Sequence, residues 1–396
     1  MIAVTQTWTL LVDAYRELNA RKLFWITLFL SGLLVIVFAL LGITDQGVTF
    51  GPFTMPLPLS LGFFGGEENG ERNFYALMFS NFGVNIWLTW IAAILALIST
   101  AGIVPDLIQG GAIDTVLSKP IGRVRLLLTK YFLGLLFVTL QVSVFTFGCF
   151  FVFGFRANVW EPQLLLAIPI VVTFFSYLYG VCALLGLLTR STIASLLVTL
   201  LFWFVLFLVN SADVILLQFR TQSELTEQRL VERIERIESN TERGIIGRVR
   251  REQGDEAADA YEVSDQELLE TNPFLVRSRE DLESTRADLY DPWGLVFWSD
   301  SITTLKTVLP KTTETTALLE RTLVDLNELD FGDLPEDDNA LPSDEVEGVS
   351  ISAREVNIAT EEALRDRSTW WIVGTSLLFE AAVLGLGCLI FWRRDF

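Results

Sequence analysis

Glu380 is the side chain best placed for chemistry in an apolar environment, because it lies near the middle of the run SLLFEAAVLGLG. An ionised carboxylate at the centre of a bilayer costs several kcal/mol, so Glu380 should be protonated or should face a polar cavity. It could line a transport path, contact a second subunit, or form hydrogen bonds with a neighbouring helix. A subunit contact would use the nearby small residues Ala381, Ala382, Gly385 and Gly387.

A second group of candidate residues lies in the segment 105–132, PDLIQGGAIDTVLSKPIGRVRLLLTKYF. A short helix between a glycine hinge and Pro120 could dock in a groove on a soluble partner and transmit movement to the attached spans. Arg123, Arg125 and Lys130 would hold the loop at an anionic membrane surface. The alternative is an ordinary basic loop. The candidate contact residues are Asp106, Gln109, Gly110, Gly111, Asp114, Lys119, Pro120 and Arg123.

Several kinds of chemistry are excluded by composition. The chain has no histidine, so His-based catalysis and His-ligated zinc are not expected. It contains no Gly-x-x-x-x-Gly-Lys-Ser/Thr phosphate loop and no calcium-binding loop pattern. Cys149, Cys182 and Cys388 all lie in apolar stretches, where they are expected to be packing residues. We therefore predict no catalytic, cofactor or metal site in this chain.

Six apolar stretches are long enough to cross a hydrocarbon core of roughly 30 Å, which takes about 20 helical residues. The first lacks the small-residue cleavage pattern of a signal peptide and is expected to remain as a span. The predicted spans are 23–43, 84–104, 131–153, 164–188, 192–217 and 370–392.

Basic residues in the short loops predict the orientation of these spans. One side carries ten, whereas the short loops of the other side carry only Arg72 and Arg156. Both termini are therefore expected in the cytoplasm of a multi-pass inner or plasma membrane protein. The ten are Arg16, Arg21, Lys22, Lys119, Arg123, Arg125, Lys130, Arg190, Arg393 and Arg394.

The segment 219–368 between the fifth and sixth spans is polar and acidic. It holds 17 basic and 36 acidic residues, so its net charge of −19 equals that of the whole chain. The orientation predicts that this segment is extracytoplasmic. It contains the apolar, aromatic-rich patch Trp293, Leu295, Val296, Phe297 and Trp298, which could lie at the outer membrane interface or form the core of the outer domain.

Two long helices are expected to carry this insert. Residues 192–243 contain neither Gly nor Pro, so the fifth span should continue as a stalk with an apolar stripe that includes Leu230 and Ile234. On the return side, Ser352 and Glu355 form a capping-box pattern that predicts a helix running into Trp370. The acidic stretch 330–346 between them predicts a mobile loop.

Two further segments flank the first span. Residues 1–22 carry apolar residues at three- and four-residue spacing, which predicts an interfacial amphipathic helix or a short helix packed on the protein. The outer loop 44–83 is apolar but contains Pro52, Pro56 and Pro58, which forbid a regular span. It could dip into the interface or cover the outer mouth.

The segment 105–132 resembles the coupling region of type-2 ATP-binding cassette (ABC) exporter permeases. Asp106 matches that family's leading acid, 111–114 its central turn, 116–120 its apolar-to-proline step, Arg123 its arginine and Lys130 its membrane-entry lysine. Four features depart from the pattern: Pro105, an Asp at 106 where Glu is commoner, the doubled Gly110-Gly111 and the large insert. The resemblance covers residues 1 to about 218 and 369–396. It implies two permease chains associated with two cytoplasmic ABC ATPase subunits, which would use the ATP.

These observations predict an all-α polytopic membrane protein with six transmembrane helices, an N-terminal interfacial helix and a large extracytoplasmic insert. The predicted parts are the interfacial helix 1–22, spans 23–218 with the coupling loop 105–130, the acidic domain 219–368, and the last span with its tail, 369–396. The expected function is a non-enzymatic permease subunit of an ABC exporter, in contact with lipids and not with nucleic acid. The alternatives are a proton-coupled secondary transporter using Glu380 and a membrane-anchored sensor or scaffold.

Overall fold

A computed structural model describes residues 22–44, 47–55, 66–108, 122–158, 160–323 and 351–393. The described residues are 88% helical, and six helices are long and apolar enough to cross a membrane. This confirms the predicted number of spans and indicates a membrane-embedded, polytopic protein. The six helices are Lys22–Leu40, Gly70–Ile108, Arg123–Arg156, Pro162–Thr189, Thr192–Gln253 and Trp370–Arg393.

The chain forms two compact units. The membrane unit comprises Met1–Leu208, Thr307–Pro335 and Ser368–Phe396, and the insert unit comprises Val209–Lys306 and Glu336–Arg367. Residues 307–323 therefore belong with the spans, although the sequence predicted one acidic domain over 219–368. They do so because Leu319 and Leu323 are buried in the apolar core of the membrane unit.

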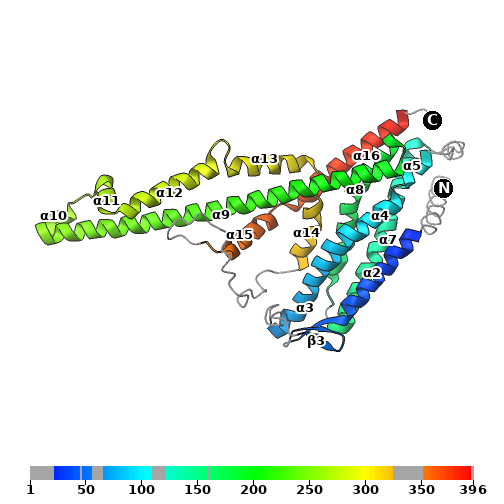
Figure 1. Cartoon of the computed structure of the whole chain (residues 1–396), viewed down its shortest axis with the longest axis horizontal. Coiled ribbons are helices and arrows are strands. Elements are labelled where there is room, and N and C mark those ends of the chain that lie inside the picture. The colour runs from blue at the N-terminus through cyan, green and yellow to red at the C-terminus, as the bar shows by residue number, and fades with distance from the viewer. Residues whose placement is uncertain are drawn as a thin grey trace. The chain divides into compact units, whose positions relative to one another are not determined.

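The membrane unit begins with α2 (Lys22–Leu40) and a long helical run made of α3 (Gly66–Met78), the π-helix η1 (Phe79–Ala92), α4 (Ala93–Thr100) and α5 (Ile103–Ile108). It continues with α7 (Arg123–Ala157), the short 3-10 helix η2 (Pro162–Leu166), α8 (Ala167–Thr189) and the first part of α9 (Thr192–Gln253). It ends with α14 (Thr312–Leu323), the π-turn η4 (Trp370–Gly374) and α16 (Thr375–Arg393), as Figure 1 shows.

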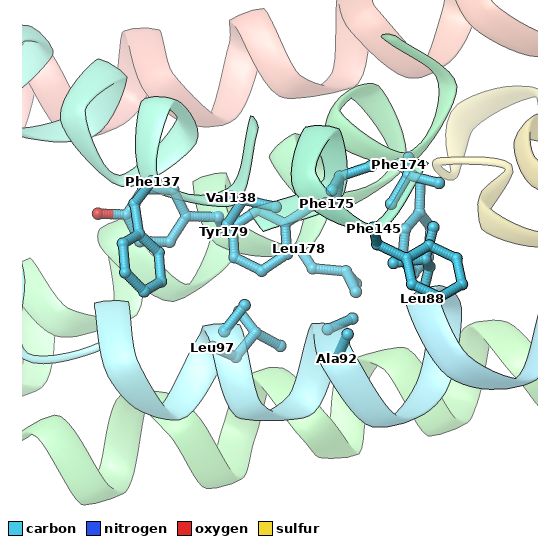
Figure 2. Packing of buried hydrophobic residues seen from close by; sticks show 14 of the residues in the cluster. Leu88, Ala92, Leu97, Phe137, Val138, Phe145, Phe174, Phe175, Leu178 and Tyr179 are labelled. Carbon is cyan, nitrogen blue, oxygen red and sulfur yellow. The ribbon is translucent and has the colours of Figure 1, made fainter. Parts of the chain in front are cut away.

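Helix α8 contacts α5, α7, α14 and α16, so it lies at the centre of the membrane unit's helix packing. Its buried face carries Phe174, Phe175, Leu178 and Tyr179, which pack with residues of η1, α4 and α7 (Figure 2). Aromatic side chains bury large apolar areas, so this layer stabilises the packing between these helices.

The outward faces of the span helices are apolar as well. In α2, Trp25, Phe29, Leu33 and Ile36 recur at helical spacing and remain exposed, and α7 and α9 show the same pattern. A helix that is apolar on all sides is typical of a membrane environment, because lipid replaces water around it.

The segment after the first span differs from the all-α prediction. Strands β1 (Leu41–Thr44), β2 (Gly47–Phe50) and β3 (Phe53–Met55) form an antiparallel sheet in the order β1-β2-β3. Gly51 and Pro52 make the two-residue turn between β2 and β3, and Gly51 has φ +58°. A glycine with positive φ at the first turn position is typical of a type II′ hairpin, so this glycine and proline close a hairpin.

The second span also begins earlier than predicted. Helix α3 starts at Gly66 and continues without a break into η1, within the segment predicted as an outer loop. The polar residues of α3 conceal this in the sequence, but Phe74, Tyr75 and Phe79 are buried. Tyr75 and Phe79 pack on rings of α7, and Phe74 packs on Tyr75. Residues 56–65, with Pro56 and Pro58, lie outside the described residues.

The insert unit is built on the second part of α9, which is one continuous helix to Gln253. The predicted continuation of the fifth span is thus confirmed and extends beyond Gly244 and Gly247. Short helices α10 (Asp255–Asp259) and α11 (Asp265–Thr271) lead to α12 (Pro273–Tyr290) and α13 (Leu295–Val308). These return antiparallel to α9, since Asn272 bonds Thr241 and Arg286 bonds Glu227 (Figure 1).

Helix α15 (Ala353–Arg365) confirms the predicted capping box. Ser352 Oγ accepts from the backbone N–H of Glu355, whose side chain in turn accepts from the backbone N–H of Ser352. The predicted run into Trp370 is wrong, because α15 ends at Arg365. The predicted interfacial helix, apart from Lys22, and the acidic stretch 330–346 lie outside the described residues.

Candidate functional site

Glu380 lies on α16 and points into the membrane unit, with only 9% of its surface exposed. Its Oε1 accepts a hydrogen bond from Tyr131 Oη of α7 at 2.7 Å, and its Oε2 lies 2.6 Å from Ser176 Oγ of α8. Of the three interpretations left open by the sequence, the contacts correspond to hydrogen bonding with neighbouring helices. One carboxyl thereby ties three helices together.

The hydrogens available at this site are few. Tyr131 Oη also lies 3.0 Å from the Ser176 carbonyl, and Ser176 Oγ lies 2.8 Å from the Thr173 carbonyl. Each hydroxyl carries one hydrogen, so two hydrogens serve four acceptors when Glu380 is ionised. A protonated carboxyl would add a third hydrogen. Among the described residues no Lys or Arg forms an ion pair with Glu380.

Two glycines make room for this cluster. A Cβ on Gly180 would lie 3.7 Å from Glu380 Cγ, and one on Gly134 would lie only 2.6 Å from the Tyr179 ring. The Tyr179 ring stacks on Tyr131 with centroids 5.1 Å apart, so Gly134 allows α7 and α8 to approach with two rings between them. The arrangement around Glu380 is therefore closely packed.

The small residues on α16 divide between two faces. Gly387 is buried, whereas Ala381, Ala382 and Gly385 are exposed. Since Glu380 is buried, it does not share a face with those three exposed residues. A subunit contact at the exposed Ala381, Ala382 and Gly385 would therefore not include the Glu380 carboxyl.

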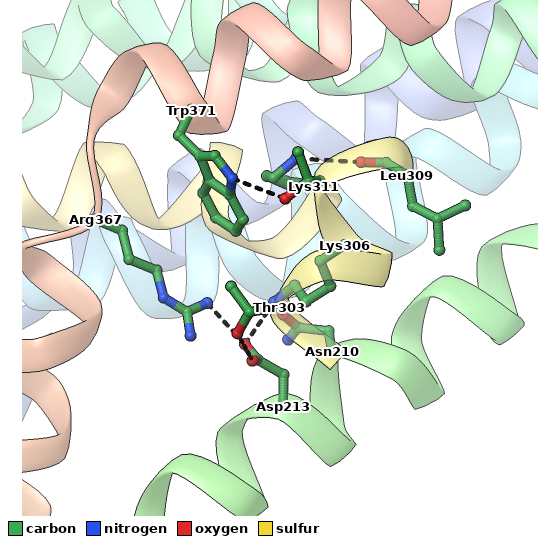
Figure 3. A network of polar contacts seen from close by, with 9 residues as sticks. Asn210, Asp213, Thr303, Lys306, Leu309, Lys311, Arg367 and Trp371 are labelled. Atoms are coloured by element: carbon green, nitrogen blue, oxygen red, sulfur yellow. Dashed lines mark hydrogen bonds and ion pairs between the residues drawn. The ribbon is translucent and has the colours of Figure 1, made fainter. Parts of the chain in front are cut away.

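Lys311 is a second buried polar group of the membrane unit, and the sequence did not single it out. It is 2% exposed, directly before α14, and its Nζ donates to Thr375 Oγ1 at 2.6 Å. The ammonium also lies 4.3 Å from the centre of the Trp371 ring (Figure 3). The Lys311 backbone N–H donates to Ser376 Oγ. Cation–π contact and hydrogen bonds offset the cost of burying the charge.

Lys311 and Glu380 therefore mark one polar face of α16. Ser376 precedes Glu380 by four residues, so the two share a helix face. None of the six predicted spans contains a basic residue, and Lys311 comes from the sequence of the predicted insert. The local sequence PKTTETT carries no signal for this burial.

Asp213 is the centre of an ion-pair cluster within the insert unit. It is 1% exposed, and its Oδ2 lies 2.7 Å from both Lys306 Nζ and Arg367 Nη1 (Figure 3). Lys306 also donates to Asn210, at 2.9 Å. Asn210 and Asp213 follow the point where the chain enters this unit, while Lys306 and Arg367 are the last residues before it leaves. The cluster thus joins the first residues of the insert unit to the residues at which the chain leaves it.

The predicted coupling residues are only partly described. Gln109, Gly110, Gly111, Asp114, Lys119 and Pro120 lie outside the described residues. Asp106 is exposed on α5, and Arg123 begins α7, where its Nη1 lies 3.5 Å from the Trp392 carbonyl. Helix α5 contacts both α7 and α8, and Pro105 packs on Gly186 of α8. Both ends of the loop therefore lie beside α7: helix α5, which precedes the loop, contacts α7, and Arg123, which follows the loop, begins α7.

Comparisons of the chain with protein-family models, curated proteins and solved structures found no match. Within the described residues, no cluster of three or more acidic or cysteine side chains could hold a metal ion.

Proposed function

We propose that this chain is the permease subunit of an ABC exporter, driven by ATP hydrolysis on a separate cytoplasmic subunit. The observation that carries the proposal is the coupling-like segment 105–130, which joins α5 and α7 between the second and third spans. The six apolar helices and the absence of a phosphate loop in the sequence support it.

The packing offers a route by which such a loop would act. A partner that displaces the segment between Asp106 and Arg123 would move α5 and α7, and both contact α8. Helix α8 is hydrogen-bonded to α16 through Ser176 and Glu380. Rigid helices and close packing transmit small displacements as rigid-body motion. The fixed ends of the loop therefore suit a mechanical coupling role.

The proposal includes a membrane arrangement. Both termini and the coupling loop are cytoplasmic, the insert unit is extracytoplasmic, and two permease chains form the path with two ATPase subunits. The exposed apolar faces of the span helices are available for lipid and for the second permease chain.

Copurification tests this proposal. The tagged chain, isolated from its native membranes, should bring with it a subunit that contains a phosphate loop and hydrolyses ATP. Gly111→Trp should obstruct the loop turn and Asp114→Lys should reverse a contact charge, so both should lose the ATPase while inserting normally. Asp291→Lys, a matched reversal of an exposed acid in the insert unit, should retain it. Full ATPase association in both loop variants would contradict the proposal.

A proton-coupled carrier is the second candidate, favoured by the shared hydrogens of Glu380, Tyr131 and Ser176. Glu380→Gln separates the two, since it removes ionisation while nearly preserving shape. A proton-driven carrier should lose transport with Glu380→Gln and tolerate the loop variants, whereas an ATP-driven permease should show the reverse order.

A further inference from the structure

Helix α13 of the insert has its polar and apolar faces reversed relative to a helix of a water-soluble domain. Ser299 and Lys306 are 5% and 4% exposed. By contrast, Phe297, Trp298, Leu305 and Val308 are 42%, 47%, 51% and 70% exposed. A helix on a water-soluble protein normally buries its apolar stripe and exposes its polar one.

The aromatic residues at the start of α13 form a connected surface. The rings of Trp293, Phe297 and Trp298 have centroids 5.1 to 6.2 Å apart. Gly294 is needed for the tight turn before them, because a Cβ there would lie 2.6 Å from the Leu289 carbonyl oxygen. That turn holds Trp293 in a position where it is 72% exposed. The alternative that this patch is the core of the outer domain is therefore wrong.

The charges of α13 are satisfied within the insert unit. Lys306 pairs with Asp213, and Asp300 pairs with Arg220 at 3.1 Å. The exposed face from Phe297 to Val308 otherwise carries only uncharged residues, although the insert segment as a whole has a net charge of −19. A surface that faces water or binds a charged protein partner would be expected to carry charged residues. This neutral, aromatic strip does not fit either role.

The chain passes from the insert unit to the membrane unit near the end of α13, between Lys306 and Thr307. Lys311, three residues after the end of the helix, is buried in the membrane unit. The helix has 14 residues, so its far end is about 20 Å from that attachment. Tryptophan is enriched where hydrocarbon meets the headgroup layer.

We propose that the exposed face of α13, with Trp293, lies in the headgroup region of the lipid bilayer and anchors the insert unit to the membrane surface. The occupant is lipid. An amphipathic helix of this kind inserts its apolar face about 5–10 Å into the boundary between headgroups and acyl chains.

Spin-label accessibility tests the proposal on the full chain in phosphatidylcholine nanodiscs. Ser301→Cys and Thr304→Cys place labels on the exposed face without replacing an aromatic residue, in a chain whose three native cysteines are changed to alanine. Ser284→Cys, exposed on α12, is the matched control.

The ratio of collision with oxygen, which partitions into lipid, to collision with a water-soluble nickel chelate should be several-fold higher at both positions than at Ser284. Equal ratios at all three positions would mean that the face contacts water and would overturn the proposal. Protection of Ser301 and Thr304 from both reagents would indicate a protein partner, such as a second copy of the chain, and would also overturn it.

Discussion

Asp213 and Lys306 form a 2.7 Å ion pair although 93 residues separate them in the chain. Arg367 approaches the same carboxylate oxygen at the same distance. One buried carboxylate thus faces two cations. Its removal would take a shared charged partner away from two cations that are mostly buried.

Asp213→Asn should therefore destabilise the insert unit by about 3–5 kcal/mol, the usual cost of breaking a buried ion pair on one side. Limited proteolysis of the full chain in nanodiscs should show faster cleavage within 209–306. Asp300→Asn is the control. Asp300 is exposed and its partner Arg220 is only half-buried, so this pair should contribute no more than about 1 kcal/mol. Equal protease resistance of the two variants would show that the Asp213 cluster is not structural.

Gly134→Ala should destabilise the membrane unit. The added methyl would meet the Tyr179 ring, which is 1% exposed and stacked on Tyr131, so it cannot move aside freely. Overpacking of this kind costs about 1–3 kcal/mol. Gly385→Ala, where no atom lies within 4 Å of the new methyl, should be neutral or slightly stabilising. Thermal unfolding midpoints of the two purified variants give the comparison.

Glu355 predicts a pH dependence in the insert unit. Burial raises the pKa of its carboxyl. The Ser352 backbone N–H and the Arg229 guanidinium together lower this pKa by more than burial raises it, so the net shift is downward. A lowered folded-state pKa gives stabilisation that is present above the unfolded pKa of about 4.3 and is lost as the pH falls through the folded value. Both side chains are partly exposed, so the effect should not exceed about 1 kcal/mol.

Glu355→Gln should keep the cap of α15 but lose this acid-dependent stabilisation. The stability of the variant should therefore approach that of the parent chain as the pH falls through the lowered pKa of Glu355 in the folded state. Ser352→Ala should instead cost about 1 kcal/mol at every pH, because it removes the cap itself. Hydrogen exchange of the α15 amides distinguishes the two. A constant difference between Glu355→Gln and the parent chain at all pH values would refute the assignment.

The proposed orientation can be checked with single cysteines in a chain lacking Cys149, Cys182 and Cys388. A cysteine at Ser343 should react with an impermeant thiol reagent in intact cells, and one at Ser118 should react only after the membrane is opened. Labelling in the opposite order would reverse the orientation.

Local sequence patterns predicted the helices that are determined by residues close together in the chain. Apolar length predicted six span helices, the run without Gly or Pro predicted α9, and Ser352 with Glu355 predicted the start of α15. The hairpin at Gly51 and Pro52 was missed because both residues also mark irregular loops. The early start of α3 was missed because its polar residues outweigh Phe74 and Tyr75.

The polar clusters could not be predicted in the same way. Glu380 stood out because a carboxylate in an apolar run is unusual, but its partners Tyr131 and Ser176 lie 249 and 204 residues away. Lys311 lies in a polar stretch, and its burial depends on contacts with Trp371, Thr375 and Ser376, which follow 60 or more residues later. Tertiary packing decides such positions, and a single sequence does not display it.

The Asp213 cluster also sets an order of events during biosynthesis. Asp213 is made 93 residues before Lys306 and 154 residues before Arg367. Contacts between such distant residues close large loops and form late in folding. The base of the insert unit cannot be completed until Arg367 has been translated, by which time α9, α12 and α13 have already been synthesised. The last span follows directly, so its synthesis coincides with the closing of the cluster.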